Sequence, residues 1–139
     1  DLKALVAQLP KNASYIVLQK DLSDDERAFI GSFENIFAPG KKLETFSDTA
    51  AICMSLDQVI SVDTSVAHLS AALGKPTVIL LPYRADWRWG YNSDKTPWYP
   101  SVRLLRQQKH AEWGQALSRC LPSVLDHFEW SCCNNVTMI

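Results

Sequence analysis

One segment of the chain, residues 57–82, constrains the fold more than any other, because it reads as strand, turn, helix, glycine stop and strand. Its two apolar, β-branched runs are typical of strands in a parallel sheet that is covered on both faces. Between them we expect a helix that starts at Asp63 or Thr64 and ends at Gly74, because Pro76 prevents its continuation. The segment therefore predicts half of a nucleotide-binding α/β fold.

The first turn of this helix is the strongest candidate for a binding site. The backbone N–H groups of Thr64, Ser65 and Val66 lack partners within the helix and lie at the positive end of its dipole, which favours an anion. Ligands of open parallel sheets bind beyond the carboxyl ends of the strands, where this turn falls. His68 is expected one turn further along, off a core stripe of Val66, Leu69 and Leu73. The alternative is an ordinary capped helix with a half-buried histidine.

Strands and helices alternate along the rest of the chain. Strands are expected at residues 15–18, 36–37, 59–62, 77–81 and 102–105, and helices at residues 2–9, 23–30, 47–55 and 111–127, the third capped by Ser47 or Asp48 and the last kinked at Pro122. This alternation predicts an α/β fold, a Rossmann-like three-layer α/β/α arrangement with a mostly parallel sheet. We expect one domain over residues 1–130 and a disordered tail over residues 131–139.

Two further positions fall at the same edge of the predicted sheet. Gln19 and Lys20 follow the first strand, where a lysine could neutralise a diphosphate leaving group. The alternative for Lys20 is a solvated loop residue. Asp48 begins another helix at this edge and could bind hydroxyl groups of a ligand, although simple N-capping explains it equally well.

An aromatic block follows the second strand of the opening segment. Its rings are Tyr83, Trp87, Trp89, Tyr91, Trp98 and Tyr99. With Asp86 and Arg88 between them, these rings suit contacts to a base, a sugar or a phosphate. The alternative is a plug against a neighbouring domain. We expect residues 86–89 near the cleft and Trp98 and Tyr99 in packing.

Composition excludes several classes of function. The chain has 14 basic and 15 acidic residues and a formal net charge of −1, so nothing favours nucleic acid or an anionic membrane surface as a partner. No apolar run approaches the roughly 18 residues of a membrane span, and we expect a soluble, cytoplasmic protein. The four cysteines lack zinc-site spacing, so we expect reduced thiols and no metal, with Cys53 as a small buried hydrophobe.

Residues 61–82, SVDTSVAHLSAALGKPTVILLP, resemble the signature of the C-terminal domain of heptosyltransferase-like glycosyltransferases, glycosyltransferase family 9. The similarity extends upstream through FSDTAAICMSLDQVISVD and downstream through LLPYRADWRWGYNSDKTPWYPSVRLLRQ, which resembles a subgroup often fused to tetratricopeptide repeats. The resemblance covers roughly residues 15–120. It implies the GT-B architecture of two Rossmann-like halves that face each other across a cleft, of which this chain is the donor-binding half.

The resemblance also implies roles. A nucleotide-diphosphate sugar would be the donor, with no metal or other cofactor, and the amides of residues 64–66 would hold its diphosphate. Asp63 would meet a sugar hydroxyl or orient the turn, and His68 would contact phosphate or sugar. No catalytic residue is expected here, because the general base belongs to a missing N-terminal acceptor-binding half. Ser65 stands where the family commonly has glycine, which leaves the donor's identity open.

Two alternative functions remain. The first is a non-catalytic interaction module, in which the fold is a scaffold and the aromatic block docks a protein. The second is a fragment of a sugar-nucleotide epimerase or dehydrogenase, which is disfavoured because no G-x-G-x-x-G motif follows a predicted strand.

Overall fold

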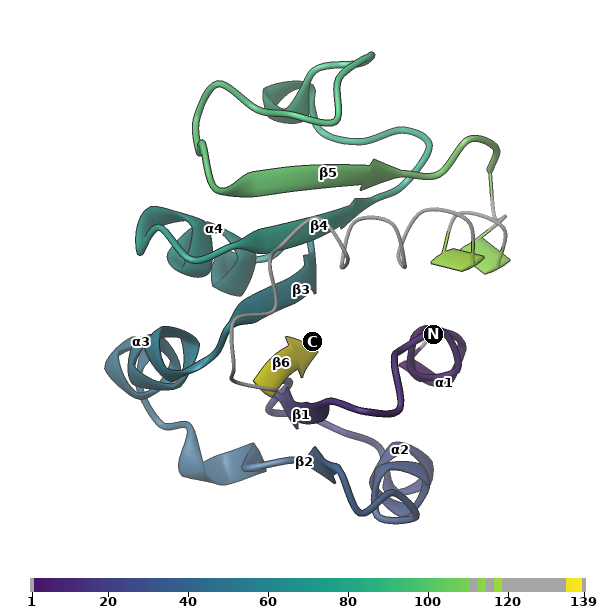
Figure 1. Ribbon diagram of the computed structural model, residues 1–139, viewed down its shortest axis with the longest axis vertical. Helices are drawn as coiled ribbons and strands as arrows, with labels where there is room; N and C mark the ends of the chain where they lie inside the picture. Colours follow the sequence, from purple (N-terminus) through teal and green to yellow (C-terminus); the bar gives the residue numbers. More distant parts are fainter. Residues whose placement is uncertain (1, 111–112, 115–116, 119–134, 139) are drawn as a thin grey trace.

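A parallel sheet with helices on both faces organises the molecule. The computed structural model describes residues 2–110, 113–114, 117–118 and 135–138. The strands are β1 (Ser14–Val17), β2 (Ile36–Phe37), β3 (Gln58–Val62), β4 (Thr77–Leu81), β5 (Val102–Arg106) and β6 (Asn135–Met138). They form one six-stranded sheet in the order β2-β1-β6-β3-β4-β5, and every pair is parallel (Figure 1). The predicted Rossmann-like three-layer α/β/α fold is confirmed.

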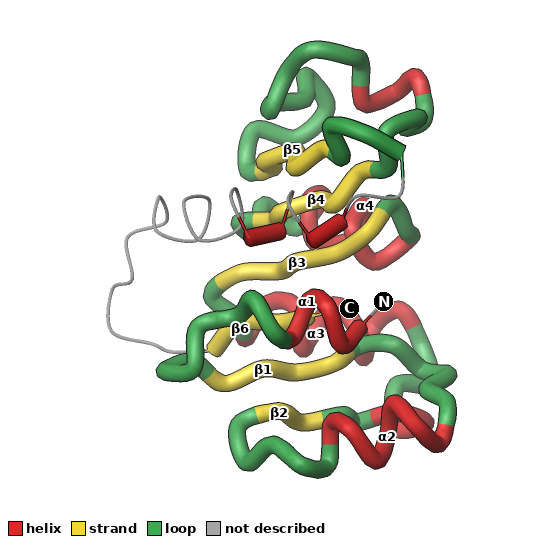
Figure 2. Tube along the Cα trace, turned by 90° about the vertical axis from the view of Figure 1, so that its right-hand side faces the viewer, coloured by secondary structure: helices red, strands yellow, loops and turns green. Residues whose placement is uncertain are grey.

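The helices divide between the two faces of the sheet. They are α1 (Leu2–Val6), α2 (Asp24–Ile30), α3 (Phe46–Ser55) and α4 (Ser65–Ala72), with short 3₁₀ turns η1 (Gly40–Lys42) and η2 (Trp87–Trp89). Helices α1 and α2 cover one face, and α3 and α4 cover the other (Figures 1 and 2). The helix expected at residues 111–127, with its kink at Pro122, lies mostly outside the described residues. Within it, Trp113 and Leu117 pack against the core on the α1 side. No helix in the described ranges is long and apolar enough to cross a membrane.

Capping residues explain where α3 begins. Thr45 is its N-cap and accepts a hydrogen bond from the backbone N–H of Asp48, while the Asp48 carboxylate accepts from the backbone N–H of Thr45. The expectation that Ser47 or Asp48 is the cap was therefore wrong. Asp48 is the third helical residue, the position from which a carboxylate reaches back to the cap in a capping box.

Helix α4 ends as predicted but turns a different face to the core. Gly74 adopts a left-handed conformation (φ 74°) and the Lys75 N–H bonds the Ser70 carbonyl, which stops the helix. The buried residues are Ala67, Ser70 and Ala71, so the expectation that Val66, Leu69 and Leu73 form the core stripe was wrong. Small side chains let the helix approach the sheet closely, and the buried hydroxyls of Ser70 and Thr77 bond each other at 2.8 Å.

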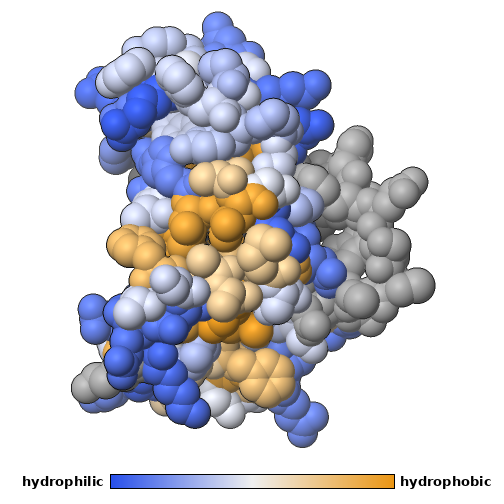
Figure 3. Space-filling view, turned by 90° about the vertical axis from the view of Figure 1, so that its left-hand side faces the viewer, coloured by the Kyte–Doolittle hydropathy of each residue, from blue (hydrophilic) through white to orange (hydrophobic). Residues whose placement is uncertain are grey.

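Apolar side chains of α3 and α4 remain at the surface of this face. Leu73 at the end of α4 and Met54 on α3 are 37% and 54% exposed, and Phe46 at the start of α3 is also exposed. Figure 3 shows apolar side chains gathered on the face of the molecule that α3 and α4 cover. An apolar surface of this kind is a common feature of sites that contact another protein.

Strand β6 contradicts the expectation of a disordered tail. Asn135–Met138 lies between β1 and β3 and pairs with both of them in parallel. Only four residues form it, so local sequence gave little sign of a strand. Without β6, the backbone groups of β1 and β3 that face each other would be buried without hydrogen-bond partners. Tertiary pairing therefore decides the conformation of this segment more than its local sequence does.

The aromatic block covers an edge of the sheet. The Leu104 N–H in edge strand β5 bonds the Asp94 carbonyl at 2.7 Å, and the Arg106 guanidinium bonds the carbonyls of Ser93 and Trp89. Burial lowers the pKa of Arg106 from its ordinary value. The loop therefore occupies backbone groups that an open edge would offer to another chain.

The rings of this loop divide differently from the prediction. Trp89 is buried at 2% exposure and Tyr99 packs beside it, which confirms the prediction for Tyr99 only. Trp98 is 57% exposed, although its indole N–H donates to the Arg88 carbonyl at 2.9 Å. Trp87 is 70% exposed.

Candidate functional site

The chain reverses its winding direction between β1 and β3, which defines a switch point at the carboxyl edge of the sheet. The β1–α2–β2 unit runs toward one side of the sheet with its helix on one face, and β3–α4–β4 runs toward the other side with its helix on the opposite face (Figure 1). The loops that carry Gln19 and Asp63 leave the sheet here. Crevices at such points are where ligands bind in open α/β sheets.

The N-terminus of α4 differs from those of α2 and α3 in lacking a side-chain cap. Thr64 holds the extended N-cap conformation, but its Oγ1 bonds Ser61 Oγ at 3.0 Å and makes no capping bond to the helix. In contrast, Ser23 and Thr45 both cap their helices through the side chain. The first-turn N–H groups of α4 therefore stay open to an acceptor from outside the chain.

Asp63 and His68 lie together beside this turn. The His68 Nε2 is 3.6 Å from the Asp63 Oδ1, and both side chains are about one-third exposed (35% and 27%). The other ring nitrogen, Nδ1, is 3.0 Å from the Tyr99 hydroxyl. The His68 ring stacks on Trp89, with centroids 5.2 Å apart and planes inclined by 24°. His68 lies one turn above the helix start and outside the buried set of Ala67, Ser70 and Ala71, as predicted, and its partial burial is what the alternative interpretation expected.

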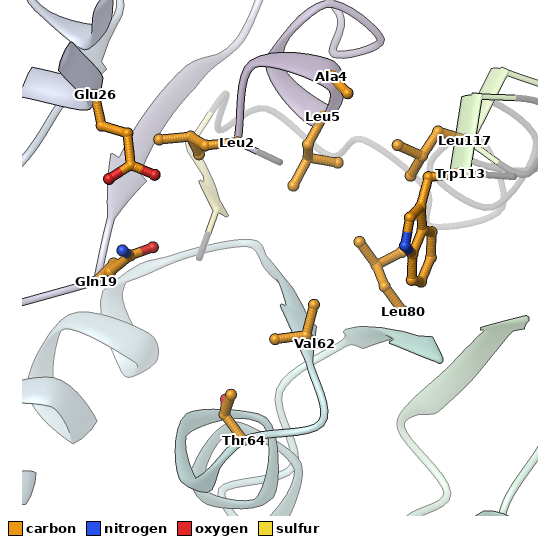
Figure 4. Close-up of a pocket in the computed structure, with 10 residues that line it drawn as sticks. All are labelled: Leu2, Ala4, Leu5, Gln19, Glu26, Val62, Thr64, Leu80, Trp113 and Leu117. Carbon is orange, nitrogen blue, oxygen red and sulfur yellow. The ribbon is translucent and has the colours of Figure 1, made fainter. Parts of the chain in front are cut away.

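A pocket that Thr64 lines opens at the switch point, and neither Asp63 nor His68 is among its lining residues. It has a volume of about 440 Å³. Its lining residues are Leu2, Ala4, Leu5, Gln19, Glu26, Val62, Thr64, Leu80, Trp113 and Leu117. Figure 4 shows their side chains around one common space, with the Trp113 indole and the aliphatic groups forming an apolar wall. This size and mixture of lining groups are typical of small-molecule sites.

Of the remaining predicted residues, Gln19 lies at this pocket, whereas Lys20 and Asp48 lie at the start of α3. Gln19 lines the pocket and donates to the Asp21 carbonyl at 2.8 Å. Lys20 donates to the Glu44 carbonyl at 3.1 Å, beside the start of α3. Asp48 is engaged in the capping box, so capping explains its position without a ligand.

Asp86 and Arg88 belong to a different part of the surface. The Asp86 carboxylate accepts from the Arg88 backbone N–H and lies 3.3 Å from its Nε, which caps η2. Arg88 also lines an open groove of about 580 Å³ together with Trp87 and Trp98. Among the described residues, Asp86 and Arg88 bond each other, whereas Asp63 pairs with His68.

A pH-dependent test separates the capping role of Asp48 from ligand binding. Hydrogen bonds from the Thr45 backbone and side chain lower the pKa of Asp48 from its ordinary value. A carboxylate with a lowered pKa stabilises the fold above its unfolded-state pKa of about 4, and this stabilisation is lost as pH falls through the folded-state pKa. We therefore expect Asp48→Ala to lower the melting temperature at neutral pH and to have a smaller effect at about pH 3. Thermal unfolding followed by circular dichroism measures both, with Asp21→Ala as the exposed control. Equal losses at the two pH values would contradict the capping role.

Sequence reasoning missed several residues at this site. Trp89 and Tyr99 were recognised as aromatic loop residues but not as neighbours of His68, because sequence spacing does not report how a loop folds back. The pocket residues Val62, Leu80 and Trp113 carry no motif and would have been read as ordinary core. In the described part of the chain, no group of His, Cys, Asp and Glu side chains could hold a metal ion. Cys53 is buried, as predicted, and burial raises the pKa of its thiol.

The fold and this edge define a class: a Rossmann-like α/β domain with an uncapped helix N-terminus and a pocket at its switch point. The sequence matches the profile of glycosyltransferase family 9 (heptosyltransferase) over residues 40–116, more than half of the chain. The chain therefore belongs to glycosyltransferase family 9. It is also 31% identical over 80 residues to Protein FlbA of Caulobacter vibrioides; the match covers 57% of this chain and 13% of FlbA. No solved structure matches the chain.

Proposed function

We propose that this chain is the donor-binding half of a metal-independent GT-B glycosyltransferase and binds a nucleotide-diphosphate sugar. One observation carries the proposal. In a chain of glycosyltransferase family 9, the α4 N-terminus lacks a side-chain cap and opens at the sheet's switch point, beside a pocket of nucleotide-fitting size.

The diphosphate binds at the start of α4. The N–H groups of residues 64–66 and the helix dipole stabilise its negative charge. Glycosyl transfer breaks the bond between sugar and phosphate, so charge grows on the departing diphosphate, and fixed N–H donors stabilise that charge without a metal. The His68 ring adds a further hydrogen-bond donor beside the diphosphate. Asp63 meets a sugar hydroxyl or orients the turn, and the second role is the one that a nucleotide without a sugar reports. Lys20, whose side chain is exposed, adds positive charge once it leaves the Glu44 carbonyl.

The base and ribose occupy the pocket beside Thr64. Trp113 offers an indole to a flat ring, and Gln19 offers an amide at the mouth. Asp86 and Arg88 lie in the aromatic loop and contact the donor only when the second half of the enzyme closes over the cleft.

The acceptor and the general base belong to an N-terminal partner half, in the same polypeptide and in the cytoplasm. The profile match covers a length that is too short for two Rossmann-like halves. Tetratricopeptide repeats are a second proposal for the neighbouring segment, because residues 80–107 resemble the subgroup that is often fused to them. The 139-residue chain alone therefore binds the donor with little or no turnover.

A nucleotide titration tests the proposal. We expect ADP, UDP or GDP to shift the ¹⁵N amide signals of Thr64, Ser65 and Val66 saturably, with one base preferred. The shifts should be lost in Asp63→Ala or His68→Ala. No shift with any of the three nucleotides at about millimolar concentration, where even weak specific binding is detected, would contradict donor binding.

Filling the pocket should block the base without harming the fold. Val62 lines the pocket and is 43% exposed, so Val62→Trp adds an indole to open space. We expect nucleotide affinity to fall by at least about tenfold, or about 1.4 kcal/mol, measured by isothermal titration calorimetry. Leu73→Trp is the matched control, because Leu73 is 37% exposed at the far end of α4. Equal affinity in wild type and Val62→Trp would place the base elsewhere.

A second candidate function is a non-catalytic protein-interaction module. The apolar surface over α3 and α4, with Met54 and Leu73 exposed, favours it (Figure 3). The nucleotide titration separates the two functions, because a scaffold has no reason to bind a nucleoside diphosphate.

A further inference from the structure

His68 is held on three sides by groups from different parts of the chain. Asp63, at the end of β3, faces its Nε2 at 3.6 Å, and the Tyr99 hydroxyl contacts its Nδ1 at 3.0 Å. Trp89 stacks against one face of the ring, and the Tyr99 ring meets it edge-on with centroids 5.8 Å apart. Trp89 and Tyr99 come from the aromatic loop, for which the sequence predicted residues 86–89 near the cleft and Tyr99 in packing, but not a contact of either ring with His68.

The loop residues are themselves fixed. Trp89 is 2% exposed and lies in a core cluster with Ala67 and Ala71 of α4. Its carbonyl accepts a hydrogen bond from the Arg106 guanidinium, which ties it to strand β5. The His68 ring therefore packs against a tryptophan that is itself held by buried contacts. Rotation of the imidazole would break the hydrogen bond to the Tyr99 hydroxyl.

These contacts select one protonation pattern of the ring. A neutral histidine carries a proton on only one ring nitrogen. With the proton on Nδ1, the bare Nε2 lone pair would face the Asp63 carboxylate, which is repulsive. With the proton on Nε2, the Tyr99 hydroxyl donates to Nδ1 and the Nε2–H faces the carboxylate, so both contacts are attractive. A charged imidazolium carries a proton on both nitrogens, and Nε2 is protonated in this form as well.

We propose that Tyr99 and Trp89 are positioning residues that hold His68 with its Nε2–H directed to the Asp63 side of the α4 N-terminus. The inference deepens the proposed function and rests on it in one respect: the ligand that receives this N–H is a phosphate or sugar oxygen of the donor. Asp63 favours the tautomer with the proton on Nε2, the Tyr99 hydroxyl holds that ring in place by donating to Nδ1, and Trp89 sets the plane of the ring. Trp89 and Tyr99 thus belong to the donor site through His68, without contacting the donor themselves.

The first experiment reads the imidazole directly and needs no ligand. In the ¹⁵N-labelled chain at alkaline pH, where the ring is neutral, we expect a pyrrole-like Nε2 signal and a hydrogen-bonded, pyridine-like Nδ1 signal for His68. His110→Gln and His127→Gln assign the signals. In Tyr99→Phe, which keeps the ring but removes the hydroxyl, the Nδ1 signal should move to that of a free pyridine-like nitrogen. A protonated Nδ1 in the wild type, or an Nδ1 signal unchanged in Tyr99→Phe, would overturn the inference.

The second experiment measures binding in the same variants. We expect Tyr99→Phe to lower the affinity for the preferred nucleoside diphosphate by about threefold to tenfold, the range for loss of one hydrogen bond. Tyr91→Phe is the matched control, because Tyr91 is 79% exposed in the same loop, and it should change neither signal nor affinity. If the Nδ1 signal responds to Tyr99→Phe but no nucleotide binds any variant, the proposed function fails while the positioning role stands. If nucleotide binds wild type and Tyr99→Phe equally, the positioning role fails while the proposed function stands.

Discussion

Replacing Trp89 by alanine should destabilise the protein more than any other single substitution in the aromatic loop. Trp89 is 2% exposed and fills the space between α4, β4 and β5, where Ala67, Ala71 and Ile79 surround it. Truncating a buried tryptophan to alanine costs about 3–5 kcal/mol, because transfer free energy is lost and a cavity remains. We expect the free energy of unfolding to fall by that amount in urea denaturation followed by far-ultraviolet circular dichroism, which does not depend on the deleted fluorophore.

The neighbouring Trp87 is the matched control. It lies in the same 3₁₀ turn but is 70% exposed. Trp87→Ala should therefore change stability by no more than about 0.5 kcal/mol, the usual range for a surface position. Similar losses in the two variants would show that the loop does not bury Trp89 as described, and would also remove the support that Trp89 gives to His68.

A proline in strand β6 should lower the free energy of unfolding about as much as Trp89→Ala does. Thr137 pairs with Ile16 of β1 and Val59 of β3, so its backbone lies between two hydrogen-bonded neighbours. Proline cannot donate to the ladder, and its ring is excluded from central strands. We expect Thr137→Pro to cost about 3 kcal/mol or more and to separate β1 from β3, which amide hydrogen exchange would detect as lost protection in both strands.

Thr137→Val distinguishes the backbone from the side chain. Valine is β-branched and keeps the backbone N–H. Its stability and exchange protection should match those of the wild type. If Thr137→Pro retained full protection in β1 and β3, β6 would not be a central strand of the folded protein in solution.

The fold was largely predictable because its signals are local. Alternating strands and helices, Gly74 as a helix stop and the buried strand Thr77–Leu81 all act through neighbouring residues. The position of His68 followed from helical spacing alone. These features needed no knowledge of what lies across the sheet.

The errors arise where distant residues decide the outcome. Strand β6 forms because β1 and β3 need a partner, and the buried face of α4 is set by how closely Ala67 and Ala71 let the helix approach. The contacts of His68 with Trp89 and Tyr99 depend on how a long loop folds back over α4. Local propensity carries no information on these tertiary contacts.

The place of β6 in the sheet also orders events during synthesis. Strands β1 to β5 leave the ribosome first, and until Asn135–Met138 has been added the edges of β1 and β3 that face each other have no partner. Pairing between such distant segments is slow, and unpaired edges attract strands from other chains. The nascent protein therefore passes through a stage at which aggregation competes with closure of the sheet, and pairing of β6 with β1 and β3 ends that stage.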